Sequence, residues 1–138
     1  MTLIADTSFL VSLINPREPS HSACVAVAQN IRERLVVPQV VLPEATYLVD
    51  KYLGHAAMRA MVRQFLQATW SLEPLLDGDM ERIAAVLDQY HDQNIDFADA
   101  AIVAIAERLN VRRILTLDRR HFLLMRPRHC PDFEVLPA

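Results

Sequence analysis

Glycine is scarce in this sequence: only Gly54 and Gly78 occur among its 138 residues. Two isolated glycines cannot form a G-x-G-x-x-G turn or a G-x-x-x-x-G-K phosphate-binding loop. Nucleotide binding through a glycine-rich loop is therefore excluded. The chain also lacks a run of about 18 apolar residues, so the sequence predicts no segment that crosses a membrane.

Cysteine and paired histidines are also rare. Cys24 and Cys130 lack the spacing of a metal site and need not pair, which fits a reduced, cytoplasmic setting. No H-x-x-x-H or H-E-x-x-H spacing occurs, so no zinc site is expected. The N-terminal segment MTLIADTSFL has no basic region, and it is therefore not interpreted as a secretory signal peptide.

Lysine occurs once, at Lys51, so almost all positive charge comes from arginine. The net charge of −3 argues against binding of nucleic acid through overall charge alone. Arginine is nevertheless concentrated near the C-terminus, at Arg112, Arg113, Arg119, Arg120, Arg126 and Arg128. Guanidinium groups form forked contacts with phosphate oxygens. Composition alone leaves a phosphate-binding surface and an ordinary solvated surface equally open.

Short apolar runs alternate with longer helical patterns along the chain. The runs predict strands at 3–5, 35–37, 70–75, 113–117 and 133–136. The helical patterns predict helices at 9–14, 20–34, 40–52, 55–69, 79–91, 97–109 and 119–124, with Ser20 and Asp79 as caps. This alternation predicts a central parallel sheet between helices, a three-layer α/β/α sandwich. We expect one domain over residues 1–138.

The stretch from Asp96 to Asp118 is the centre of this prediction. Residues 97–109 are apolar almost all round, which is typical of a buried helix, and Asn110 is a plausible C-terminal stop. Asp96 and Asp99 stand three residues apart and so share a helix face. Asp118 directly follows the run 113–117, which we expect to be a buried strand.

Four acids are candidates for one site. Asp6 and Asp118 follow predicted strands, while Glu44 and Asp99 lie near helix starts. Ligands bind beyond the carboxyl ends of strands in parallel sheets, so these acids are expected to converge there. Helix capping explains each acid singly, including Asp96. Apolar neighbours flank Glu44 and Asp99, however, and carboxylates in apolar surroundings need a partner.

Convergent carboxylates repel one another, and a hard divalent cation relieves that repulsion. Mg²⁺ and Mn²⁺ prefer oxygen ligands and retain water, which allows attack on a phosphodiester. Thr7, Ser8 and Thr116 are candidates to donate hydrogen bonds to the acids or to the scissile phosphate. Their alternative roles are helix capping for Thr7 and Ser8 and strand formation for Thr116.

Four segments resemble the acidic motifs of PIN-domain ribonucleases, in particular the VapC-type toxins of prokaryotic toxin–antitoxin pairs. They are Asp6-Thr7-Ser8, Pro43-Glu44-Ala45, 99–104 (DAAIVA) and 115–122 (LTLDRRHF). By position, Asp6, Glu44, Asp99 and Asp118 match the acidic quartet of that family. Asp96 is less regular there, so we interpret it as a helix cap. The resemblance implies a homodimer and a cognate antitoxin whose tail covers the active site.

The resulting hypothesis is an Mg²⁺-dependent endoribonuclease, with Mn²⁺ able to substitute, that acts as the toxin of a type II toxin–antitoxin pair. The acidic quartet would hold the metal, a metal-activated water would hydrolyse RNA, and the resemblance implies a 5′-phosphate product. Arg119 and Arg120 would position the RNA backbone. His121 is expected to be an ordinary surface histidine, with RNA contact as the alternative.

Two other functions stay open. The first is a non-catalytic module of the same fold that binds RNA or protein, which would need no metal. The second is a phosphatase with Asp6 as nucleophile, although that chemistry usually has a second acid two residues on, where Ser8 stands.

Overall fold

Five short apolar segments form one parallel sheet in the computed structural model, which describes residues 2–67 and 69–138. The strands are β1 (Thr2–Ala5), β2 (Arg34–Pro38), β3 (Trp70–Glu73), β4 (Arg113–Leu115) and β5 (Glu134–Leu136). Their order is β3-β2-β1-β4-β5, and every neighbouring pair is parallel. The chain therefore moves outward from β1 in one direction and returns to the other side of β1 at β4.

The central strand β1 is covered on both faces. Ile4 pairs with Val36 of β2 and Ile114 of β4, and all three side chains are buried. Strands without a solvent-facing side are apolar throughout instead of alternating, which explains the short runs seen in the sequence.

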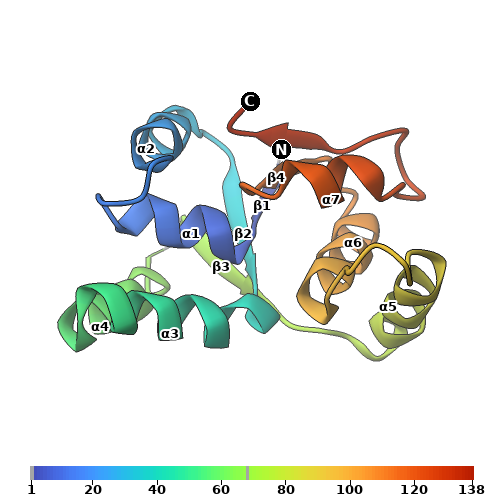
Figure 1. The fold of residues 1–138 in the computed structure, drawn as a ribbon, viewed down its shortest axis with the longest axis horizontal. Helices are drawn as coiled ribbons and strands as arrows, with labels where there is room; N and C mark the ends of the chain where they lie inside the picture. Colours follow the sequence, from blue (N-terminus) through green and yellow to red (C-terminus); the bar gives the residue numbers. More distant parts are fainter. Residues whose placement is uncertain (1, 68) are drawn as a thin grey trace.

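Helices cover the sheet on both sides and confirm the predicted three-layer α/β/α architecture. They are α1 (Thr7–Ile14), α2 (His21–Asn30), α3 (Leu42–Leu53), α4 (His55–Gln64), α5 (Asp77–Gln89), α6 (Phe97–Leu109) and α7 (Arg119–Leu124). Figure 1 shows α1 to α4 on one side of the strands and α5 and α6 on the other. The two chain ends lie close to each other, at the top of the view in Figure 1.

Helix α6 runs through the middle of the core. Its residues 100–106 are all buried, and small alanines among them allow close packing against neighbouring elements. Asn110 adopts a left-handed conformation (φ 57°) and ends the helix, as predicted. The helix is not buried all round, because Phe97 is 42% exposed. The first turn of α6 borders the cleft described below and is not covered by the core.

Pro43 lies at the start of α3, where a missing N–H costs no hydrogen bond. A 3₁₀ turn (Gln39–Val41) precedes it, so this segment starts a helix at the proline and does not kink there. Gly54 ends α3 with a positive φ of 95°.

Cys24 and Cys130 are both free thiols. Among the described residues, no helix has the length and apolar character needed to cross a bilayer.

Several predicted element ends were wrong. Helix α2 stops at Asn30, four residues early, and the Ser20 side chain makes no capping hydrogen bond. Helix α5 begins at Asp77, so Asp79 lies inside its first turn, where it accepts the Leu76 N–H at 2.9 Å. Helix α4 ends at Gln64, and strands β3 and β4 each end two residues before the predicted boundary.

Candidate metal centre

A cleft of about 400 Å³ opens where the strand order reverses, beyond the carboxyl ends of β1 and β4. Ligands bind at this position in open parallel sheets. Six carboxylates line the cleft: Asp6, Glu18, Glu44, Asp96, Asp99 and Asp118. The predicted quartet therefore lies around one cavity, together with two further acids.

Asp6 directly follows β1, caps α1 and is buried. Its Oδ1 accepts the Thr7 N–H at 2.7 Å, and its Oδ2 accepts the Thr116 hydroxyl at 2.8 Å. Because the single hydroxyl hydrogen of Thr116 goes to Asp6, Ser8 must be the donor in its 3.2 Å contact with Thr116. The Asp6 carboxylate is thus held in one orientation.

The same hydroxyls connect the end of β1 to the loop after β4. The Leu117 N–H donates to Ser8 Oγ at 3.0 Å, and the Asp118 N–H donates to Thr116 Oγ1 at 3.0 Å. Ser8 and Thr116 therefore fix the backbone that carries Asp118 relative to Asp6. Thr7 directs its hydroxyl elsewhere, towards the Val41 carbonyl at 3.5 Å.

Asp96 and Asp99 form a reciprocal capping box at the start of α6. Asp96 Oδ1 accepts the Asp99 N–H at 2.9 Å, and Asp99 Oδ2 accepts the Asp96 N–H at 3.4 Å. The interpretation of Asp96 as a helix cap is confirmed. Capping does not remove these residues from the site, since both side chains also line the cleft.

Asp118 caps α7 and binds His121 twice. The His121 N–H donates to Asp118 Oδ1 at 3.2 Å, and the ring Nδ1 lies 2.8 Å from Asp118 Oδ2. The other ring nitrogen lies 2.9 Å from the carbonyl of Gln93. The expectation of an ordinary surface histidine was wrong, because the His121 side chain is only 18% exposed and lines the cleft.

Three side chains come close enough to share one ion. Asp99, Asp118 and His121 each offer a ligand atom within 4.8 Å of the others. Asp6, Glu44 and Asp96 line the same cleft but lie outside this group.

Glu44 differs from its predicted surroundings. It is exposed, although its sequence neighbours are apolar. The reason is that Glu44 occupies the first turn of α3, whose buried residues, Ala45 and Val49, lie on another side of the helix. Glu44 therefore reaches the cleft from its solvent-exposed rim.

Burial and mutual repulsion raise the pKa of two of these acids. Burial, followed by the charges of Asp96 and Asp6, raises the pKa of Asp99 to about 7. Burial is also the largest cause that raises the pKa of Asp6, with smaller contributions from Asp118 and Asp96. The hydrogen bond to Asp118 raises the pKa of His121. The cleft is thus short of positive charge.

Arginine does not supply that charge. Within residues 2–67 and 69–138, no arginine or lysine forms an ion pair with Asp6, Glu44, Asp96 or Asp99. Part of the predicted arginine cluster is engaged elsewhere. Arg113 pairs with Glu33 and Glu134, and Arg126 pairs with Asp132.

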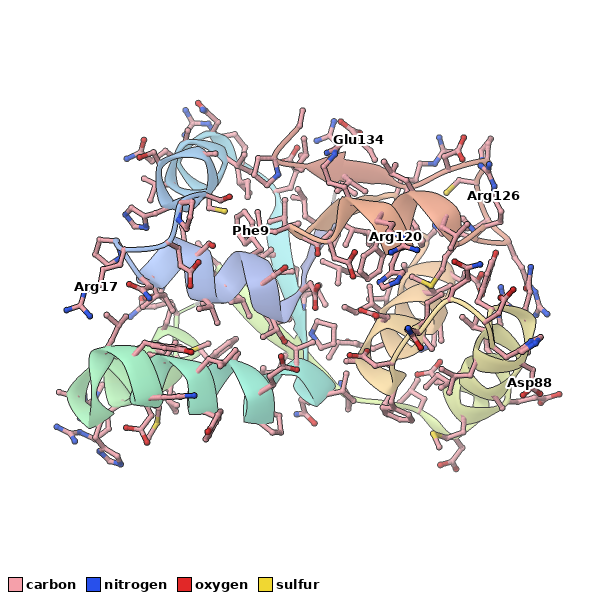
Figure 2. All side chains as sticks on the ribbon, viewed as in Figure 1. Phe9, Arg17, Asp88, Arg120, Arg126 and Glu134 are labelled. Atoms are coloured by element: carbon pink, nitrogen blue, oxygen red, sulfur yellow. The ribbon has the colours of Figure 1, made fainter. Side chains whose placement is uncertain are left out.

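Arg119 and Arg120 both lie at the start of α7, next to Asp118. The Arg119 guanidinium donates to the carbonyls of Val135 and Pro137, at 3.1 and 3.0 Å. Arg120, labelled on α7 in Figure 2, is exposed. Neither side chain lines the cleft itself.

Two ionisable residues of the cleft, Glu18 and His121, were not among the predicted site residues. Glu18 lies in the turn after α1, where no periodicity indicates the direction of a side chain. His121 did carry a signal, because it stands three residues after Asp118 and can contact that acid from the same helix start.

The PIN domain family model matches residues 3–125 of this chain. A protein of Mycobacterium tuberculosis, Ribonuclease VapC26, is 38% identical over 135 residues, which cover 98% of this chain and 100% of that protein. The chain is therefore similar to this protein over its whole length.

Two solved structures share the fold. VapC20 of Mycobacterium tuberculosis, described as a toxin that cleaves the sarcin-ricin loop, has a TM-score of 0.79 at 20% identity, covering 86% of this chain and 91% of that one. A toxin–antitoxin complex from Klebsiella pneumoniae has a TM-score of 0.67 at 18% identity, covering 87% of this chain and 89% of that one.

Proposed function

This chain belongs to the PIN-domain family, and we propose that it is a divalent-metal-dependent endoribonuclease, the toxin of a type II toxin–antitoxin pair. One observation carries the proposal: buried acids with raised pKa values, Asp6 and Asp99, lie beside Asp118 in a cleft where the strand order reverses. The 38% identity to a protein named as a ribonuclease supports the reaction class.

The residues around the cleft fit a hard divalent cation. Their donor set is dominated by carboxylate oxygens, which Mg²⁺ and Mn²⁺ prefer. We assign Asp6, Glu44, Asp99 and Asp118 as the residues that would hold the ion. When bound, the ion would act as a Lewis acid that neutralises charge on phosphate oxygens and makes water a better nucleophile.

The chain itself supplies position and orientation. Thr116 and Thr7 hold Asp6, and the capping box holds Asp99, so both carboxylates have fixed orientations at the cleft. Ser8 lines the cleft and accepts the Leu117 N–H, so it holds the loop that carries Asp118. Arg120 is exposed and stands two residues after Asp118 in the sequence, so it is suited to bind the RNA backbone.

The direct test replaces Asp99 with asparagine. Asp99→Asn keeps an oxygen that can accept the Asp96 N–H, so the start of α6 should stay folded. We expect RNA cleavage with Mg²⁺ or Mn²⁺ to fall at least about 100-fold, which corresponds to about 2.7 kcal/mol of transition-state stabilisation. Asp88→Asn, at an exposed position on α5 that does not line the cleft (Asp88 is labelled in Figure 2), is the matched control and should cleave as the wild type does.

A folded Asp99→Asn variant that cleaves RNA at the wild-type rate would contradict the assignment. Wild-type protein that binds RNA equally with and without Mg²⁺, and never cleaves it, would instead support the non-catalytic binding module.

The proposal includes an antitoxin partner and a homodimer. The structural likeness to a toxin–antitoxin complex supports a protein partner. Several large apolar side chains on and after α3 and α4 are exposed and suited to such contacts: Tyr47, Tyr52, Val62 and Leu66. Co-expression with the product of a small adjacent reading frame should yield a complex in which RNA cleavage is suppressed, and size-exclusion chromatography should show two copies of this chain.

A further inference from the structure

The imidazole of His121 lies between a backbone carbonyl and a carboxylate. Its Nε2 is 2.9 Å from the oxygen of Gln93, and a carbonyl oxygen can only accept a hydrogen bond. Nε2 therefore carries a hydrogen in either charge state of the ring. In the neutral ring Nδ1 presents its lone pair to Asp118, whereas the protonated ring donates a second hydrogen to it. Histidines that bind metals typically donate their other ring N–H to a carbonyl or carboxylate in this way.

The contact with Asp118 needs a positive charge. Nδ1 and Asp118 Oδ2 are 2.8 Å apart, and two lone pairs cannot face each other at that distance without a proton or a metal ion. Adjacent ligands of a six-coordinate ion lie about 3 Å apart when its bonds are about 2.1 Å long. A ligand atom of Asp99 is within 4.8 Å of both other groups.

We propose that His121 is a nitrogen ligand of the divalent cation, together with Asp99 and Asp118, and that the site consequently prefers Mn²⁺ to Mg²⁺. The inference rests on the proposed function, because that function brings the cation to the cleft. Mg²⁺ is a hard ion that takes oxygen ligands, whereas first-row transition ions accept imidazole more readily. Among the described residues, His121 is the one histidine that lines the cleft.

Pulsed electron paramagnetic resonance on the Mn²⁺-loaded full-length chain tests this directly. A nitrogen bonded to Mn²⁺ modulates the electron spin echo, and labelling the histidines with ¹⁵N changes that modulation. We expect ¹⁴N modulation in the wild type, its replacement after ¹⁵N-histidine labelling, and its loss in His121→Gln. His91→Gln, an exposed histidine just after α5, is the matched control and should keep the modulation.

Metal affinity gives a second readout. Mn²⁺ binding to His121→Gln, followed by calorimetry, should weaken about 10- to 100-fold, and Mg²⁺ binding should weaken less. Loss of affinity alone would not identify a ligand, because removing a group that only orients Asp118 has an effect of similar size. The comparison between Mn²⁺ and Mg²⁺ makes that distinction.

The outcomes separate this inference from the proposed function. Mn²⁺ that binds the wild type without histidine modulation would overturn the ligand role of His121 and leave the metal-dependent nuclease intact. A wild-type chain that binds no Mn²⁺ would overturn both. If His121→Gln does not fold, the labelled wild-type spectrum still decides the question.

Discussion

Single carboxylates in this protein serve both the fold and the candidate site. Asp6, Asp96 and Asp118 each cap a helix by accepting a backbone N–H at its start. Burial and the charges of Asp96 and Asp6 raise the pKa of Asp99, which lies in the first turn of α6. In the absence of a cation, the site should therefore lower the stability of the folded chain when its acids are ionised.

The first prediction concerns stability against pH. The pKa of Asp99 is about 7 in the folded chain and about 3.9 in an unfolded chain, so the folded state binds more protons between these values. Without metal, the contribution of Asp99 to the free energy of unfolding should fall as pH rises from about 4 to about 7. Asp99→Asn should be the more stable protein at pH 8 and lose that advantage at pH 4, as measured by urea denaturation in EDTA.

Asp88→Asn should follow the wild-type stability profile. Equal stability differences between wild type and Asp99→Asn at pH 4 and pH 8 would contradict the raised pKa.

The second prediction concerns the buried hydroxyl of Thr116. Thr116→Val keeps the shape of the side chain but removes the donor to Asp6 and the acceptor for the Asp118 N–H. We expect a loss of about 1–3 kcal/mol in the free energy of unfolding, together with slower RNA cleavage. Thr116→Ser retains the hydroxyl and should lose much less activity. Equal cleavage rates for the two variants would show that the hydroxyl does not hold Asp6.

At the scale of whole elements, one arginine that does not line the cleft joins three parts of the fold. Arg108 of α6 binds Glu73 at the end of β3 at 2.6 Å and Asp79 of α5 at 3.0 Å. It also donates to the Pro74 carbonyl at 3.2 Å. The hydrogen bond to Arg108 keeps the pKa of Asp79 below its usual value despite burial. This contact fixes α5 against α6.

The third prediction follows from that contact. Arg108→Gln leaves the nearly buried Asp79 without its cation, so the free energy of unfolding at pH 7 should fall by about 1–3 kcal/mol. Cleavage per folded molecule should be unchanged, because Arg108 does not line the cleft. Arg63→Gln, at an exposed position on α4, is the control and should unfold like the wild type. A folded Arg108→Gln with unchanged stability would contradict the role of this contact.

The same residues explain which elements could be predicted from the sequence. Most residues of helix α6 and of the central strands are buried. Buried elements consist of apolar residues, which form runs that can be recognised in the sequence. The start of α5 depends on Asp79, whose partner Arg108 is 29 residues away. No local pattern indicates that pairing, and so Asp79 was assigned to the wrong helix position.

At the scale of the whole molecule, the strand order brings distant acids together. Asp6 and Asp118 were predictable candidates because each follows a strand, and the sheet places the ends of β1 and β4 side by side. The approach of His121 to Asp99 depends on how α7 and the loop at Gln93 meet, which no sequence pattern encodes. The sequence thus predicted the acids of the cleft except Glu18, and it did not predict the histidine beside them.

The fourth prediction concerns RNA binding by the basic end of the chain. Arg119 and Arg120 are both exposed, but the Arg119 guanidinium is bound to carbonyls of the C-terminal segment. In an Asp99→Asn background that prevents cleavage, Arg120→Gln should weaken RNA binding. The plot of the logarithm of the RNA association constant against the logarithm of salt concentration should also become shallower, with a slope smaller by about 0.7. That change is expected for the loss of one contact to a single-stranded phosphate.

Arg63→Gln in the same background should leave both the affinity and the salt dependence unchanged. Identical salt dependence with and without Arg120 would place the RNA contact elsewhere.

The most direct measurement is a paired Mn²⁺ titration of the wild type and Asp99→Asn, in which melting temperature and RNA cleavage are followed in the same samples. An ion that binds only the folded chain raises its stability by about 2.7 kcal/mol at 100 times its dissociation constant. We predict that the wild type gains melting temperature and activity at the same half-saturating Mn²⁺ concentration, and that Asp99→Asn gains far less of both. Cleavage by the wild type in EDTA, or a melting temperature that Mn²⁺ does not change, would contradict the account.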